Sequence, residues 1–224
     1  MGMTTLRDIQ TRADAGDQDA LGVLVAFNVV ESALLYGHIP TFGRSDTEIL
    51  DRVRQYVDAF VADDGPIHGV VDRAPDLLLT ARSLRAEGRH DEAFVYFATW
   101  IEHWANDLLS IVLRRRQCDE TVVLQMLREV SLRSKLTWLP IVLGLPALDQ
   151  ALVGSVLRLS DARNSFIHFK WQFTDMDGRG EAARRETELL ASADDIVAQL
   201  TEYASTHLKA EPKRLALLFL GLTG

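Results

Sequence analysis

The sequence predicts an all-α protein, built as an up-down bundle of four to five helices that follows a helical extension. Apolar residues recur at spacings of three and four along most of the chain, and no segment shows the sustained alternation of a half-buried strand. Hydrophobic residues make up 47% of the chain and charged residues 25%, an ordinary balance for a protein with a buried core. The bundle is expected over residues 89–224 and the extension over residues 1–88.

Four helices are expected in the extension, each marked by residues that favour helix ends. Thr or Asp stands at the expected starts, Gly follows three of the four expected ends, and Pro75 stands in the first turn of the last helix. None of the four contains a motif of known chemistry. They are a short helix from Thr4 or Thr5 to near Gly16, and helices over residues 17–36, 45–61 and 75–87.

The bundle is expected to begin with a long helix that ends in the basic run Arg114 to Arg116, where cations suit the negative helix end. Its apolar stripe consists of Phe94, Phe97, Ile101, Trp104, Leu108 and Ile111. Further helices are expected over residues 120–130, 132–143 with an interruption at Pro140, 147–169 and 181–207, with a Gly/Asp loop over residues 175–180.

The charge distribution limits the kind of ligand this protein binds. The net charge of −8 argues against a protein that coats nucleic acid over its whole surface, because such binding needs many Lys and Arg contacts to phosphates. The stretch from Arg114 to Lys170 is different, with 9 basic and 5 acidic side chains. An anionic ligand is therefore expected in that middle stretch.

Cysteine content and hydropathy indicate a cytoplasmic protein that does not interact with a membrane. Cys118 is the single cysteine, so no intramolecular disulfide forms and no cysteine-based zinc site is expected. Residues 1–12 lack the apolar core of a signal peptide. The apolar segments at residues 20–36 and 215–222 are short for a membrane span, and we expect them to pack in the interior.

The helix expected over residues 147–169 has two apolar faces and an unusual polar end. One face is the expected core stripe, and Arg163 projects within it, where a guanidinium is costly to bury unless it is paired. Asn164 and His168, four residues apart, share the other face. Burial against a second body, such as a symmetric copy, accounts for this pattern. The core stripe consists of Leu148, Leu152, Val156, Leu159 and Phe166.

A purely structural interpretation of these three polar residues stays open at this stage. A histidine near a helix end often caps or packs, and Arg163 has three possible acidic partners in Asp161, Glu102 and Asp107.

The run Arg163-Asn164-Ser165-Phe166-Ile167-His168 reads R-N-x-x-x-H and resembles the R-x(4–6)-H signature of HEPN domains, the helical nucleases of prokaryotic defence and toxin–antitoxin systems. The context is similar too, since a long helix with Glu102 in its middle and the segment at residues 131–136 precede the motif helix. The resemblance covers roughly residues 90–210.

The resemblance implies a metal-independent endoribonuclease without cofactors, which acts as a homodimer with one composite site. His168 would move protons at the ribose 2′-hydroxyl or the leaving oxygen, because imidazole titrates near neutral pH. Arg163 would bind the scissile phosphate, and Asn164 would orient His168 or the phosphate. Glu102 would hold Arg163 in position, while Arg158 and Lys170 would contact RNA phosphates. A nucleotidyltransferase-type antitoxin is the protein partner that such systems imply.

Other interpretations remain beside this one. The same groove fits a non-catalytic HEPN-like module that binds a nucleotide or a partner protein, and a helical interaction protein with an accidental motif is a third reading. A di-metal carboxylate bundle fits poorly, because such sites use two Glu-x-x-His pairs on helices. The single Glu-x-x-His here, Glu87 to His90, is expected in a loop. Serine hydrolase chemistry lacks a G-x-S-x-G motif.

Overall fold

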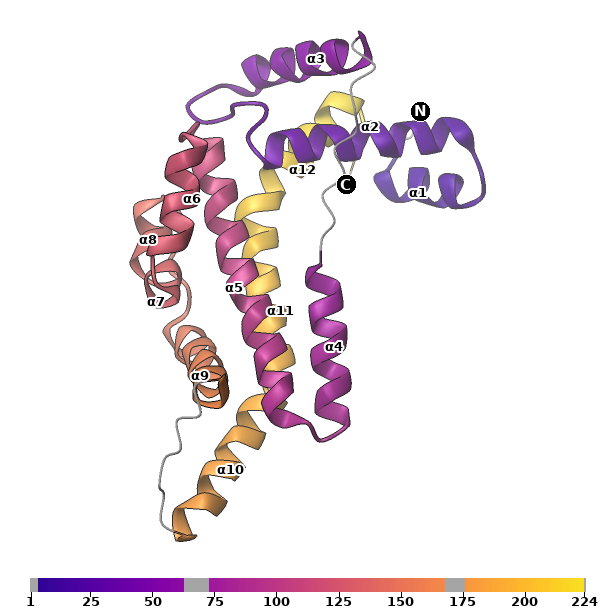
Figure 1. The fold of residues 1–224 in the computed structure, drawn as a ribbon. Coiled ribbons are helices and arrows are strands. Elements are labelled where there is room, and N and C mark those ends of the chain that lie inside the picture. The colour runs from indigo at the N-terminus through magenta and orange to yellow at the C-terminus, as the bar shows by residue number, and fades with distance from the viewer. Residues whose placement is uncertain (1–3, 63–72, 168–175, 224) are drawn as a thin grey trace. The chain divides into compact units, whose positions relative to one another are not determined.

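The computed structural model describes residues 4–62, 73–167 and 176–223, with side chains described from residue 184 onward in the last range. Helices dominate these residues, and the single β-type pairing among them is an isolated bridge between Thr5 and Thr223 (Figure 1). The prediction of an all-α protein is confirmed.

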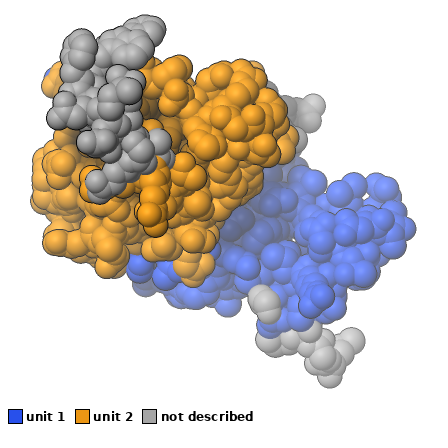
Figure 2. All heavy atoms as spheres, turned by 90° about the horizontal axis from the view of Figure 1, so that it is seen from below, with its two compact units in different colours: residues 1–69, 110–125, 204–224 blue, residues 70–109, 126–203 orange. Residues whose placement is uncertain are grey.

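The described chain forms two compact units, shown in separate colours in Figure 2. Each unit collects segments that are distant in sequence, so neither is one continuous stretch of chain. The predicted division into residues 1–88 and 89–224 stays a prediction. Unit 1 comprises residues 1–69, 110–125 and 204–224, and unit 2 comprises residues 70–109 and 126–203.

Side-chain caps fix the starts of the first two helices of unit 1, of which the second is the apolar one. Thr5 and Asp8 form a reciprocal capping box at the first helix, and the Asp17 carboxylate accepts a hydrogen bond from the Ala20 amide at the second. The first three elements are α1 (Leu6–Asp14), α2 (Gln18–Leu35) and α3 (Asp46–Ala62), and a π-helical turn (Ser205–Lys209) leads into α12 (Ala210–Leu220) at the other end of the chain.

Helix α2 is the one helix of the described chain that is long and apolar enough to cross a membrane, judged by length and composition. Core helices of soluble proteins and signal sequences have the same properties. Within unit 1 its side chains Phe27, Val30 and Leu34 are buried in a cluster with residues of α3 and α12, whereas Leu21 and Val25 are exposed. The predicted cytoplasmic location stays a prediction.

Unit 2 has one continuous apolar core formed by residues from α4, α5, α7, α9, α10 and α11. Its largest fully buried side chains include Phe94, Phe97 and Ile101 of α5, which belong to the stripe expected there. Its elements are α4 (Ala74–Ala86), most of α5 (His90–Arg115), the end of α6 (Glu120–Glu129), α7 (Leu132–Leu136), α8 (Trp138–Val142), α9 (Gln150–Ile167), α10 (Met176–Ala191) and α11 (Ala193–Ala204).

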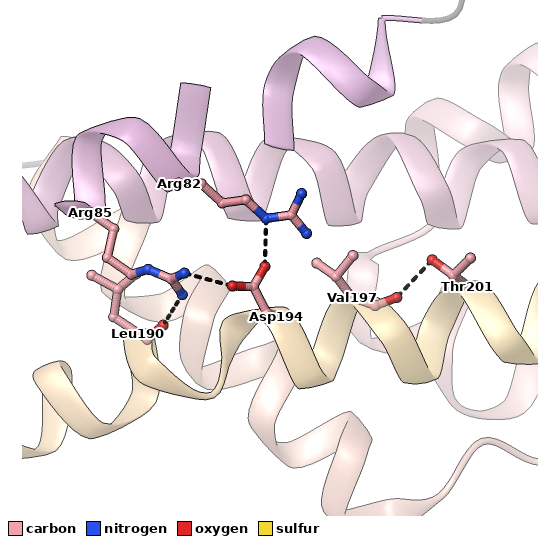
Figure 3. Close-up of polar contacts among 6 residues, drawn as sticks. All are labelled: Arg82, Arg85, Leu190, Asp194, Val197 and Thr201. Atoms are coloured by element: carbon pink, nitrogen blue, oxygen red, sulfur yellow. Dashed lines mark hydrogen bonds and ion pairs between the residues drawn. The ribbon is translucent and has the colours of Figure 1, made fainter. Parts of the chain in front are cut away.

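Helix α4 is tied to α11 by a branched set of charged contacts (Figure 3). Arg82 donates from Nε to one oxygen of Asp194 at 2.8 Å, and Arg85 donates to the other oxygen at 2.6 Å. Arg85 also donates to the Leu190 carbonyl and lies over the ring of Phe97, 5.7 Å from its centre. These contacts fix α4 against the core of unit 2.

The helix expected over residues 132–143 is two short helices, and the interruption expected at Pro140 lies three residues earlier, at Thr137. Thr137 has φ −108° and ψ −89°, outside the helical region. In a continuous helix the Pro140 ring would collide with the Leu136 carbonyl four residues before it. Breaking at Thr137 removes that collision and leaves Pro140 in the first turn of α8, where its missing N–H is harmless.

The C-terminal half of unit 2 also differs from expectation in its helix ends. Residues 176–180, expected as loop, belong to α10, because two glycines raise the cost of a helix by only about 1 kcal/mol each and do not forbid it. The single helix expected over residues 181–207 is divided at Ser192, whose hydroxyl bonds the Leu189 carbonyl and competes with the regular helix pattern.

Candidate functional site

Helix α9 carries two of the predicted site residues, Arg163 and Asn164, near its end. The Asp149 carboxylate caps its start by accepting hydrogen bonds from the Ala151 and Leu152 amides at 2.9 and 3.0 Å, so the helix begins at Gln150 and not at Ala147. The expected stripe is buried as far as Leu159. Arg163 stands one turn further along the same stripe.

Phe166 does not belong to the core, although it was predicted in the stripe. Its side chain is 41% exposed, and neighbouring Ile167 is 45% exposed. The buried cluster of unit 2 ends along α9 at the partly buried Ala162, so the last turn extends past the residues that would cover Phe166. The end of the motif helix therefore presents an apolar surface beside the polar residues.

Arg163 forms an ion pair with Glu102, one of the three partners that the sequence left open. Arg163 Nη2, on α9, donates to Oε1 of Glu102, which lies in the middle of α5. The Arg163 side chain is 18% exposed and that of Glu102 is 39% exposed, so this pair is better shielded from water than a surface pair. It joins the motif helix to the long helix of unit 2.

The Arg163 guanidinium is not saturated by this contact. Its Nε is buried, and no hydrogen-bond acceptor among the described residues reaches it. Asn164 lies next to it and is partly exposed. Arg163 and Asn164 each carry planar N–H donors of the kind that bind an anionic oxygen.

Lys135 of α7 is a buried cation that the sequence analysis did not identify. The residue is 7% exposed, and its Nζ donates to Asn106 Oδ1 at 2.7 Å and to the Leu127 carbonyl at 2.6 Å. Burial lowers the pKa of Lys135, and the negative charge of Glu102 works in the opposite direction. Nothing in the sequence signalled this burial, because Arg133 and Ser134 beside it in α7 are also polar.

The proton-transfer residue of the predicted motif, His168, lies outside the described residues, as does Lys170. Arg158, the other predicted phosphate contact, is exposed on α9, and its guanidinium donates to the Ser155 hydroxyl at 2.9 Å. The described site therefore brings together Arg163 and Glu102. Asn164 follows Arg163 on α9, and Arg158 stands more than a turn earlier on that helix, where its guanidinium contacts Ser155.

An aromatic contact fixes the chain that leads into α9. The Tyr203 hydroxyl donates to the Pro146 carbonyl at 2.6 Å, and its ring meets Trp104 edge-on with the ring centres 6.2 Å apart. Burial raises the pKa of Tyr203. Trp104 and Glu102 belong to the same stretch of α5, so this helix supports both the start and the end of the motif helix.

Among the residues that the structure describes, no group of three or more His, Cys, Asp or Glu side chains converges to hold a metal ion. Cys118 is a free thiol of intermediate exposure.

The chain matches no protein-family model, and neither a curated protein nor a solved structure is significantly similar to it.

Proposed function

We propose that this protein is a metal-independent endoribonuclease of the HEPN type, with a HEPN-like helical bundle over residues 89–224. Its site would combine Arg163, Asn164 and His168 from two copies of the chain. The ion pair between Arg163 and Glu102 is the observation that supports this best, because it holds the motif arginine near the end of α9 at a partly buried position.

The chemistry of RNA cleavage assigns a distinct task to each motif residue. His168 takes the proton of the ribose 2′-hydroxyl or gives one to the leaving 5′-oxygen, a task that suits the imidazole group of histidine. Arg163 binds the scissile phosphate and stabilises the extra negative charge of the transition state. Asn164 orients one of the two by hydrogen bonding. The products are a 2′,3′-cyclic phosphate and a 5′-hydroxyl.

Local charge supports an anionic substrate despite the net charge of −8. Two cations lie on one face of α5 in the described site: Arg163 pairs with Glu102, and the buried Lys135 contacts Asn106 one turn away. An acidic surface elsewhere limits the number of phosphate contacts, which favours a small target such as an RNA loop. In the cell this fits a cytoplasmic toxin or defence nuclease controlled by a nucleotidyltransferase-type antitoxin.

The proposal is tested by RNA cleavage in EDTA, comparing wild type with His168→Ala and with Arg54→Ala, which changes an exposed arginine of unit 1. Cleavage with cyclic-phosphate ends that is lost in His168→Ala and kept in Arg54→Ala supports the proposal. Size-exclusion mass and far-UV circular dichroism establish that each variant is a folded dimer. Equal cleavage by wild type and His168→Ala contradicts it.

One observation favours a second candidate, a non-catalytic HEPN-like module that binds a nucleotide or a partner protein. Phe166 and Ile167 at the end of α9 are 41% and 45% exposed, and such an apolar surface beside the polar residues suits the binding of a partner. A binding module would retain nucleotide affinity in His168→Ala and give no turnover with any RNA pool.

A further inference from the structure

Glu102 and Asn106 stand one turn apart on α5 and therefore share one face of that helix. Each contacts a different cation from a different helix. Glu102 pairs with Arg163 of α9, and Asn106 accepts a hydrogen bond from Lys135 of α7. The two cations thus approach α5 one helical turn apart on the same face, one at Glu102 and the other at Asn106.

The hydrogen-bond partners of Lys135 hold its ammonium group in place without neutralising it. Both are neutral oxygens, the Asn106 amide and the Leu127 carbonyl. The negative charge that acts on Lys135 is that of Glu102, one helical turn from Asn106. Glu102 therefore acts on two cations, through an ion pair with Arg163 and electrostatically on Lys135.

We propose that Lys135 is a positioning residue, which compensates the charge of Glu102 so that Arg163 can exchange this carboxylate for a phosphodiester of RNA. This inference rests on the proposed function, and it concerns how Arg163 leaves Glu102 and becomes free to bind the substrate. With Lys135 beside it, Glu102 stays compensated after Arg163 turns away. Without Lys135, the same movement would leave a partly buried carboxylate without a counter-charge.

The geometry of Arg163 suits such an exchange. Its Nε has no hydrogen-bond acceptor among the described residues. When the guanidinium turns, it therefore breaks the contact of Nη2 with Glu102 but loses no hydrogen bond at Nε. Lys135 itself is 7% exposed, which leaves its ammonium too enclosed to bind a phosphate of the substrate directly. Its effect on RNA must therefore pass through Glu102.

The test uses the full chain with Lys135→Met, the double variant Lys135→Met/Glu102→Gln, and Lys213→Met as a control that removes an exposed lysine of unit 1. Two readouts are measured. Nitrogen NMR of the free protein gives the rotation rate of the Arg163 guanidinium. Fluorescence anisotropy gives the affinity for a 2′-O-methyl RNA oligonucleotide, which binds but cannot form a cyclic phosphate. Urea unfolding establishes that each variant is folded.

In Lys135→Met we expect slower rotation of the Arg163 guanidinium and about tenfold weaker oligonucleotide binding, because Glu102 then holds Arg163 alone. Adding Glu102→Gln removes the uncompensated carboxylate and restores affinity to within about twofold of wild type. Lys213→Met changes neither readout. A merely structural role for Lys135 would lower stability without any rescue by Glu102→Gln.

Two results overturn the inference: unchanged Arg163 rotation in Lys135→Met, or no rescue of binding in the double variant. Either one does so even if wild type cleaves RNA. A third result is possible: rotation slows in Lys135→Met, but the wild type neither binds nor cleaves RNA. It overturns the proposed function and the phosphodiester ligand, and it leaves the sharing of Glu102 by two cations standing.

Discussion

Arg163 and Glu102 are 61 residues apart in the sequence and form an ion pair that joins α9 to α5. The arginine is the more enclosed partner, with 18% of its side chain exposed against 39% for the glutamate. An enclosed guanidinium without a counter-charge is unfavourable, because it loses hydration and gains nothing in return. The pair therefore contributes to folding whatever the site does chemically.

The substitution Glu102→Gln should lower the free energy of unfolding by about 2 kcal/mol, between the values typical of exposed and of fully buried pairs. The amide keeps the size of the side chain and removes its charge, so Arg163 is left uncompensated. Urea unfolding at pH 7 measures the loss.

Glu188→Gln is the matched control for this change. Glu188 pairs with Arg184 four residues earlier on α10, and both side chains are largely exposed. An exposed pair of this spacing contributes about 0.3–0.5 kcal/mol. Equal losses in Glu102→Gln and Glu188→Gln would show that the enclosed position of Arg163 adds nothing.

The contact of Asp194 with two arginines predicts a pH-dependent contribution to stability. Burial works to raise the pKa of Asp194, but the hydrogen bonds and charges of Arg82 and Arg85 together outweigh it and hold the pKa below its ordinary value of 3.8. A carboxylate whose pKa is lowered by folding stabilises the folded state above its unfolded pKa, and that stabilisation is lost as the pH falls through the folded pKa.

Asp194→Asn should therefore cost about 1 kcal/mol at pH 7, a value that allows for the partial exposure of the group. The difference from wild type should stay constant down to about pH 5 and shrink below about pH 4. Thermal or urea unfolding over pH 3–7 measures it. Asp195→Asn, at the exposed next residue, controls for the loss of an acidic charge at the start of α11. A difference that grows on acidification would contradict the assignment.

Helix positions could be predicted from the sequence because the signals are local. The spacing of apolar residues, Thr5 and Asp17 as caps, and Pro75 in a first turn lie within each element. The breaks at Thr137 and Ser192 were not predicted, since both residues are compatible with a helix. The break at Thr137 depends on Pro140 three residues later, and the break at Ser192 depends on how α10 and α11 pack on either side of it.

The site could be predicted in part for the same reason. The spacing of Arg163 and Asn164 is local, and Glu102 was one of three possible partners for the arginine. Lys135 could not be predicted, because lysines are normally exposed and its partner Asn106 is 29 residues away. Phe166 was wrongly placed in the core because its spacing is that of the stripe, whereas burial depends on where the neighbouring helices end.

Gly37 lies where the chain after α2 passes close to the end of α5, and this predicts a steric effect on substitution. A β-carbon at Gly37 would lie 2.7 Å from the Arg114 carbonyl group and 2.8 Å from the Arg115 nitrogen, and φ there is +77°. Backbone atoms cannot move aside as a flexible side chain does. Gly37→Ala should therefore lower the free energy of unfolding by about 3 kcal/mol or more.

Gly43 provides the matched control, because it lies in the same connection with a similar φ of +72° and open space around it. Gly43→Ala should lose only about 1 kcal/mol, the cost of a left-handed conformation for alanine. Urea unfolding of both variants separates the two effects. Similar losses would show that the chain at Gly37 shifts to accept the methyl group.

The Arg115 guanidinium binds two backbone carbonyls in unit 1, one at the end of α2 and one in the π-helical turn before α12. It donates from Nε to the Leu35 carbonyl at 3.0 Å and from Nη2 to the Leu208 carbonyl at 2.6 Å, and burial lowers its pKa. Arg115→Met keeps the apolar stem and removes both donors, so two carbonyls lose their partners. A loss of about 2–4 kcal/mol is expected in urea unfolding.

Arg116→Met, at the next residue, is the control and should lose under about 1 kcal/mol, because Arg116 lies over the ring of the exposed Phe42. Equal losses at the two positions would mean that water replaces the Arg115 contacts without cost.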